Sequence, residues 1–150
     1  MSTDVEDLNT ILERAIAAAE CQMRDELGSA TACQIHKDGR VTGGLKYAEG
    51  RLVALNNLRR QLRSSAVNSL EEISAALKAE LARWRGNLVA QRARKQPAMP
   101  WLAYAQGGVD ALEELEADLT SDAQVGRAAH TQGENGRLYH PDAGNSTPVP

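Results

Sequence analysis

The chain has 150 residues, which suits a single domain, and its 42% hydrophobic and 25% charged residues are ordinary for a folded protein. Its net charge of −3 gives no general field that would attract nucleic acid or anionic lipid. No stretch approaches the roughly 18 consecutive apolar residues of a membrane span, so the composition excludes both a globally basic chain and a membrane-spanning one.

The apolar residues are mainly Leu and Ala, because aromatic residues make up only 3% of the chain and Phe is absent. Leu and Ala favour helices, whereas the β-branched and aromatic residues that favour strands are scarce. The composition therefore predicts an all-α fold, a bundle of about four helices. Leu/Ala faces bury little area, so we also expect burial against a second copy or another partner.

The first helix is expected from Thr3, which forms a capping box with Glu6, to Gly28, a residue typical of helix ends. Its apolar positions recur every three or four residues at Val5, Leu8, Leu12, Ala15, Ala19, Met23 and Leu27. Residues 33–42 place Asp38-Gly39 between short flanks, which favours a small β-hairpin, with an irregular loop as the alternative.

Residues 44–95 keep a helical pattern, either as one long helix or as two helices that meet near Ser65. Asn68 with Glu71, or Ser69 with Glu72, would cap a second helix, and the usual length of helices favours two. A further helix is expected over 101–119, started by Pro100, with a turn or two more over 122–130. These elements predict a helical domain over 1–130 and an extended tail over 131–150.

Two segments of the chain resemble each other. Residues 47–58 and 104–115 share the pattern Y-A-[EQ]-G-x-[LV]-x-A-L-x-x-L. A glycine inside a helix costs about 1 kcal/mol relative to alanine, so its presence in both copies indicates close approach of another helix. We interpret the pattern as a duplicated helical hairpin, against the alternative that two Leu/Ala-rich helices align by chance.

Catalytic and metal-binding motifs are lacking. Cys33 and His36 are the only neighbouring pair whose spacing would suit two metal ligands, or a thiol nucleophile and its base. We interpret Cys21 as a structural thiol. No phosphate-binding loop, dinucleotide fingerprint or paired zinc-ligand motif occurs. We therefore expect a protein that is not an enzyme and has no cofactor or metal.

Basic residues gather at two places, which would suit contacts with phosphate groups. The first cluster is Arg59, Arg60 and Arg63, and the second is Arg92, Arg94 and Lys95, at the tip of an antiparallel hairpin in which Arg85 would face Asp110. The alternative is that both clusters are solvated helix faces, which the acidic balance of the chain favours. A nucleic-acid-binding regulator is therefore our second functional hypothesis.

The tail contains one apolar island, Arg137-Leu138-Tyr139-His140, of the kind that docks on a protein partner. Our first functional hypothesis is a non-enzymatic adaptor or assembly protein that forms homo-oligomers and docks through this island. A structural component of a bacteriophage particle fits that description. The acidic start of the sequence is unlike a secretory signal, so we expect a cytoplasmic location, or assembly into a larger particle, and no membrane partner.

Overall fold

The computed structural model describes the backbone of residues 3–30, 43–65, 67 and 69–132, and within these ranges the side chains of residues 8–121. The described residues form four helices and no strand. The helices are α1 (Thr3–Leu27), α3 (Gly43–Ser64), α4 (Leu70–Arg92) and α5 (Met99–Gln132). The predicted all-α class is confirmed, whereas the predicted hairpin at 33–42 and the tail beyond residue 132 lie outside the described residues.

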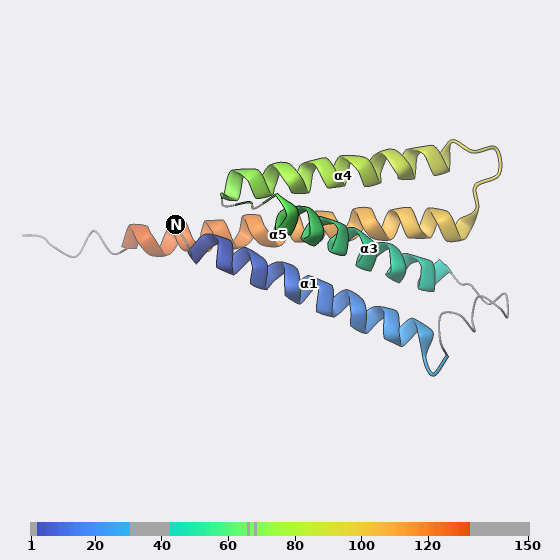
Figure 1. Cartoon of the computed structure of the whole chain (residues 1–150), viewed down its shortest axis with the longest axis horizontal. Coiled ribbons are helices and arrows are strands. Elements are labelled where there is room, and N and C mark those ends of the chain that lie inside the picture. Colours follow the sequence, from blue (N-terminus) through green and yellow to red (C-terminus); the bar gives the residue numbers. More distant parts are fainter. Residues whose placement is uncertain (1–2, 31–42, 66, 68, 133–150) are drawn as a thin grey trace, which may run out of the picture. The chain divides into compact units, whose positions relative to one another are not determined.

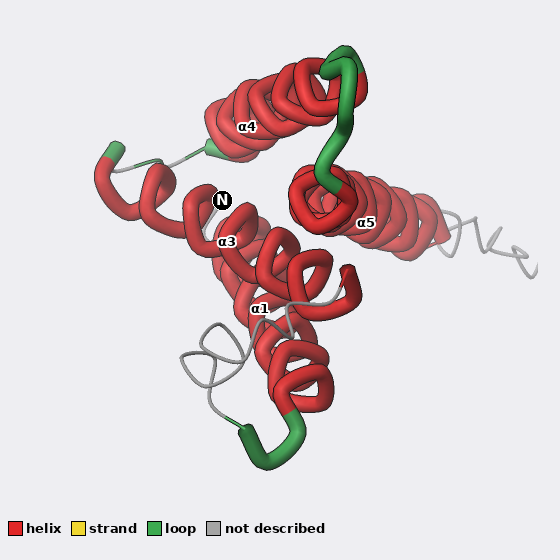
Figure 2. The backbone as a smooth tube through the Cα atoms, turned by 90° about the vertical axis from the view of Figure 1, so that its right-hand side faces the viewer, coloured by secondary structure: helices red, strands yellow, loops and turns green. Residues whose placement is uncertain are grey.

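The chain divides into two compact units, Met1–Leu119 and Thr120–Pro150. The first unit holds α1, α3, α4 and the part of α5 that ends at Leu119. Its successive helices run in opposite directions (Figure 1), as in an up-down-up-down bundle. Seen along the bundle, α3 lies between α1 on one side and α4 and α5 on the other (Figure 2).

The ends of two helices follow the local sequence signals. Gly28 has a φ of 58° and its N–H donates to the carbonyl of Arg24 at 3.0 Å, which terminates α1 as predicted. Ser69 caps α4, because its hydroxyl accepts a hydrogen bond from the N–H of Glu72 at 3.2 Å. The segment predicted as one helix or two is therefore two helices, of which α3 ends at Ser64 and α4 begins at Leu70.

The Leu and Ala faces of the four helices meet in one core within the chain. Its fully buried side chains include Leu12 of α1, Leu55 of α3, Leu77 of α4 and Leu112 of α5, and Trp84 is the one aromatic residue in the described core cluster. These Leu and Ala faces are therefore buried by the other helices of the first unit and do not require a second copy for their burial. Association with another chain would have to use other surfaces.

The two copies of the repeated pattern cross each other, one in α3 and one in α5. A Cβ atom added at Gly50 would lie 2.0 Å from the carbonyl oxygen of Tyr104, and one added at Gly107 would lie 2.1 Å from that of Tyr47. Each glycine therefore lets its helix touch the tyrosine backbone of the other copy. The matching positions are buried alike in both copies, namely Ala48 and Ala105, Ala54 and Ala111, Leu55 and Leu112, and Leu58 and Leu115.

Helix α4 is anchored to this crossing by Trp84 and Glu80. A Cβ atom at Gly108 would lie 2.1 Å from the Trp84 ring, so the indole fills the space that a side chain would occupy. The carboxylate of Glu80 is only 1% exposed, and it accepts hydrogen bonds from the Trp84 indole at 2.9 Å, from Gln61 at 2.9 Å and from Arg83. A buried charge needs such partners, so Glu80 ties α4 to α3.

Candidate functional site

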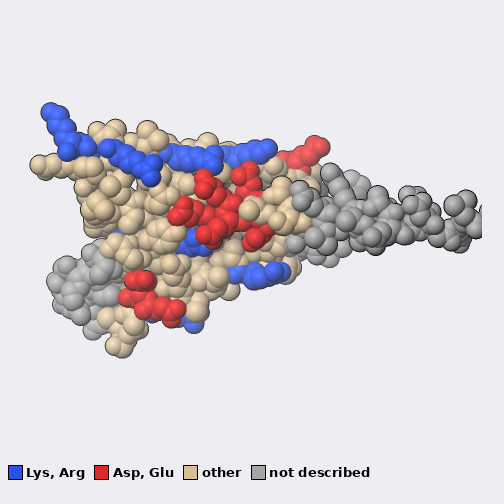
Figure 3. All heavy atoms as spheres, turned by 180° about the vertical axis from the view of Figure 1, so that it is seen from behind, with Lys and Arg blue, Asp and Glu red and all other residues tan. Residues whose placement is uncertain are grey.

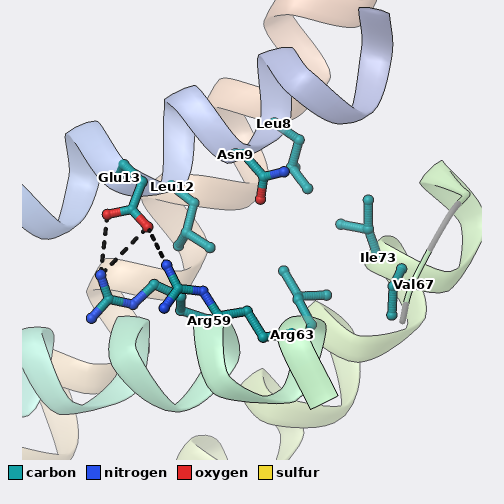
Figure 4. A pocket seen from close by; sticks show the side chains of 9 residues that line it. Leu8, Asn9, Leu12, Glu13, Arg59, Arg63, Val67 and Ile73 are labelled. Carbon is teal, nitrogen blue, oxygen red and sulfur yellow. Dashed lines mark hydrogen bonds and ion pairs between the residues drawn. The ribbon is translucent and has the colours of Figure 1, made fainter. Parts of the chain in front are cut away.

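The first predicted basic cluster lies on α3, where α1 partly neutralises it. Arg59 donates to Glu13 at 3.1 Å and Arg63 donates to the same carboxylate at 3.4 Å (Figure 4). Arg60 donates to the side-chain oxygen of Asn57. The sequence showed no acidic partner near this cluster, because Glu13 is 46 residues away from Arg59 along the chain.

A cavity of about 340 Å³ lies beside this ion-pair group. The Glu13 and arginine side chains stand at one side of it, and Ile73 and Val67 stand at the other (Figure 4). Leu8, Leu12 and Ile73 are at most 3% exposed, so a ligand in the cavity would gain little apolar contact. The cavity is therefore a weaker candidate than its volume suggests.

The second predicted basic cluster lies where α4 ends. Arg92 donates to the amide oxygen of Gln106 at 2.9 Å, and the side chains of Arg94 and Lys95 have no hydrogen-bond or ion-pair partner in the described part of the chain. Lys and Arg side chains form a row along α4, at the upper edge of the view from behind, and Asp and Glu gather on α5 beneath it (Figure 3). This cluster keeps its charge available for a partner.

Large apolar side chains are exposed at the same end of the two helices. Val89 is 64% exposed, Met99 is 71% exposed and Trp101 is 48% exposed. The ammonium group of Lys46 lies over the Trp101 ring, 4.9 Å from the ring centre, in a cation–π contact. We call this surface the α4–α5 end and define it as Val89, Arg92, Arg94, Lys95, Met99 and Trp101.

The register of the α4–α5 hairpin differs from the predicted one. Arg85 forms an ion pair with Glu113 at 2.7 Å instead of facing Asp110. Arg92 bonds to Gln106 in the same register, so the facing positions of the two helices are shifted by three residues from the predicted ones. Arg83 pairs with Glu80 on its own helix.

A polar network closes one side of the α3–α5 crossing. The Tyr47 hydroxyl donates to Asp110 at 2.7 Å, and Arg51 forms a two-bond ion pair with Glu114. Burial raises the pKa of the Tyr47 phenol, and its hydrogen bond to Asp110 raises it further. The hydrogen bond to Glu114 raises the pKa of Arg51, which therefore stays charged. The network holds α3 and α5 together.

Several predicted residues lie outside the described residues, namely Arg137, Leu138, Tyr139 and His140 of the tail and the Cys33–His36 pair. Cys21 is exposed on α1, in contrast to the structural thiol that we expected. Within the described ranges, no three His, Cys, Asp or Glu side chains come together as a metal site would require. None of the described helices has the length and apolar character needed to cross a membrane.

Comparison of the chain with protein-family models, with curated proteins and with solved structures finds no match. Function is therefore inferred from the arrangement of side chains. The sequence predicted the charged half of the α4–α5 end, and the structure adds the exposed apolar half. The position of Val89 could have revealed this apolar half from the sequence. Val89 lies four residues after Arg85 and three before Arg92, so it shares a helical face with two charged residues that are expected to face solvent.

Proposed function

We propose that the chain is a non-enzymatic helical interaction protein that docks a partner protein through the α4–α5 end. The observation that carries the proposal is the exposure of Val89, Met99 and Trp101 beside cations that have no described acidic partner. Exposed apolar groups inside a polar rim are typical of protein-binding surfaces, in which aromatic, Met and Arg residues are enriched. The partner is expected to present apolar groups together with carboxylates.

The proposal includes an assembly role, in which the partner is a second copy or a component of a larger particle such as a bacteriophage structure. Because the Leu and Ala faces are covered within the chain, self-association would use the α4–α5 end. The tail island of Arg137, Leu138, Tyr139 and His140 remains a proposed second docking element. A cytoplasmic location is part of the same proposal.

The test compares two double variants with matched controls. Val89→Ser with Met99→Ser removes the apolar part of the surface, and Leu70→Ser, which is 48% exposed at the other end of α4, is the control. Arg94→Glu with Lys95→Glu reverses the charge, and Arg14→Glu on α1 is its control. Light scattering measures self-association, and pull-down from the native source measures capture of other proteins.

The proposal predicts that both double variants stay folded and lose association or capture, while both controls keep it. A truncation after Ala129 separates the tail from the bundle, because it removes the island and leaves the α4–α5 end intact. Equal association or capture by wild type and both double variants would contradict docking at this surface.

Nucleic-acid binding is the second candidate function, and the basic row on α4 favours it. Arg94 and Lys95, which have no acidic partner among the described residues, lie at the same end as the exposed Trp101 ring, and this combination suits a single strand, in which bases stack and phosphates pair. Its test is binding of single-stranded RNA or DNA at low salt, with a fall in affinity as salt rises. The first cluster contributes less, since Arg59 and Arg63 are paired with Glu13.

A further inference from the structure

The α3–α5 crossing is closed on one side and open on the other, although the same repeated pattern builds both sides. On the closed side Tyr47 bonds to Asp110. The matching tyrosine of the second copy, Tyr104, has Val53 at the position that matches Asp110. Val53 cannot accept a hydrogen bond, and the Tyr104 hydroxyl has no hydrogen-bond partner among the described residues.

The ion pair of the closed side, between Arg51 and Glu114, is also absent from the open side. Arg51 and Glu114 on the closed side match Gly108 and Asn57 on the open side. Trp84 of α4 covers Gly108, so an indole stands where the arginine stem would have packed. Where the closed side has an ion pair, the open side therefore has the Trp84 ring and the Asn57 amide.

A cavity of about 300 Å³ results on the open side. Side chains from three helices line it, namely Val53 and Asn57 of α3, Arg83, Trp84 and Asn87 of α4, and Tyr104 of α5. Its volume is at the lower bound of small-molecule sites. All six residues belong to the first unit of the chain.

The lining offers several donors and one aromatic wall, in which Tyr104 is half-buried and Trp84 is 5% exposed, so Tyr104 supplies most of the accessible ring surface. The Trp84 and Tyr104 ring centres are 5.2 Å apart and their planes are tilted by 43°. Burial raises the pKa of the Tyr104 phenol, so the hydroxyl stays protonated and can donate at neutral pH. The Asn87 side chain is exposed and has no partner among the described residues. The Arg83 side chain, which is ion-paired with Glu80, is 60% exposed at the rim.

We propose that this cavity binds a nucleotide, with its base against the Trp84–Tyr104 wall and its phosphate at Arg83. Planar bases stack on aromatic side chains, and asparagine amides pair with the edges of bases. A guanidinium group matches the geometry of a phosphate. A phosphate at Arg83 would share the guanidinium group with Glu80, and the lining supplies several further donors, so a planar ligand that carries a phosphate suits it better than an aliphatic chain.

The site shares no residue with the α4–α5 end, but the two adjoin, because the Trp101 ring packs edge-on against Tyr104 with 5.8 Å between ring centres. The nucleotide has two sources, a free mononucleotide or one residue of a single strand, and both present the same base and phosphate. Binding of a free nucleotide would make the cavity a regulatory site, whereas binding of a strand would join it to the basic row on α4.

The test uses the fluorescence of Trp84 in the full chain carrying Trp101→Phe, which removes the other indole. Adenosine 5′-monophosphate is titrated to millimolar concentration, and calorimetry confirms the stoichiometry. We expect a saturable change in Trp84 emission. Tyr104→Phe removes only the hydroxyl and is expected to weaken binding about three- to ten-fold.

The matched control is Tyr47→Phe, which removes the equivalent hydroxyl from the closed side and is expected to leave nucleotide affinity unchanged. Adenosine and ribose 5-phosphate test the two halves of the ligand, and each is expected to bind more weakly than the whole nucleotide. An oligonucleotide that binds more tightly than the mononucleotide identifies a single strand as the source, and equal or weaker binding identifies the free nucleotide.

The proposal is overturned if neither the mononucleotide nor the oligonucleotide gives a saturable response. It is also overturned if ribose 5-phosphate binds as tightly as the nucleotide, because the aromatic wall would then have no role. Equal affinities of the Tyr104→Phe variant and its parent, with both folded by circular dichroism, would place the ligand elsewhere.

Discussion

At the scale of single residues, Glu80 differs most from what the sequence led us to expect, because its carboxylate is buried although it lies on a charged helix. Acidic residues on helices normally face water, and the sequence of α4 gives Glu80 no distinction as an acid. Its neighbours one turn later, Arg83 and Trp84, are the donors that hold it, and Gln61 adds a third from α3. The spacing of three and four residues was visible in the sequence, but burial depends on how α3 and α4 pack.

Replacing Glu80 with alanine is expected to lower the free energy of unfolding by about 3 kcal/mol. The loss follows because the buried Trp84 indole and the Gln61 amide would keep their donors without an acceptor. Urea denaturation followed by circular dichroism measures it. Glu20→Ala, an exposed acid on α1, is the control and is expected to change the free energy by less than about 0.5 kcal/mol. A loss for Glu80→Ala no larger than the control's would mean that the carboxylate is not held as described.

Alkaline pH is expected to destabilise the fold through the half-buried phenols of Tyr47 and Tyr104. The folded-state pKa values of Tyr47 and Tyr104 are raised, chiefly by burial, whereas the unfolded chain has the ordinary value of about 10. Above that pH the unfolded state releases protons that the folded state keeps, so stability present below pH 10 is lost as pH rises through the folded values. Unfolding midpoints measured from pH 8 to pH 11 test this, and Tyr47→Phe is expected to make the fall less steep.

At the scale of elements, the sequence predicted what local signals determine and missed what packing determines. The Gly28 end of α1, the Ser69 cap and the position of Pro100 near the start of α5 depend on short-range chemistry, and all three are confirmed. The register of the α4–α5 hairpin depends on how the connection folds and was three residues off. The repeat indicated close helix approach, but only the structure shows that its two copies touch each other.

The glycines of the crossing provide a sharp test of that contact. Gly50→Ala and Gly107→Ala each place a Cβ atom about 2 Å from a backbone carbonyl oxygen, which cannot move as a flexible side chain would. Each is expected to cost about 3 kcal/mol or more, at the upper end of overpacking effects. Gly86→Ala in α4 is the control, since an added Cβ atom there meets nothing within 4 Å.

The control is expected to stabilise the protein by about 0.5–1 kcal/mol, because alanine restricts the unfolded chain more than glycine does. Thermal and urea unfolding of the three variants measure the differences. A stabilising effect of alanine at Gly50 or Gly107 would contradict the close crossing of α3 and α5.

At the scale of the whole molecule, composition predicted the fold class correctly and led us to expect a core that a single chain could not complete. The prediction of four helices succeeded because Leu and Ala periodicity is a local property. The described Leu and Ala faces bury one another because close crossing compensates for small side chains, since glycine and alanine let the backbones themselves come into contact. Burial against a second copy or another partner stays a prediction. The functional surfaces were only half visible in the sequence, since exposure of apolar residues is set by the assembled bundle.

A core completed within one chain has a consequence for stability on dilution. If the core needed a second copy, dilution would populate unfolded monomer, and the unfolding temperature would fall with protein concentration. Because Leu12, Leu55, Leu77 and Leu112 are buried by one chain, we expect the unfolding temperature to change by less than about 1 °C over a hundred-fold dilution. Differential scanning fluorimetry, with light scattering at each concentration, measures both quantities. Dimers that dissociate on dilution to a monomer that stays folded, with only the small fall in unfolding temperature that mass action requires, would fit docking through the α4–α5 end. A monomer that unfolds as the dimer dissociates would show that assembly completes the core after all.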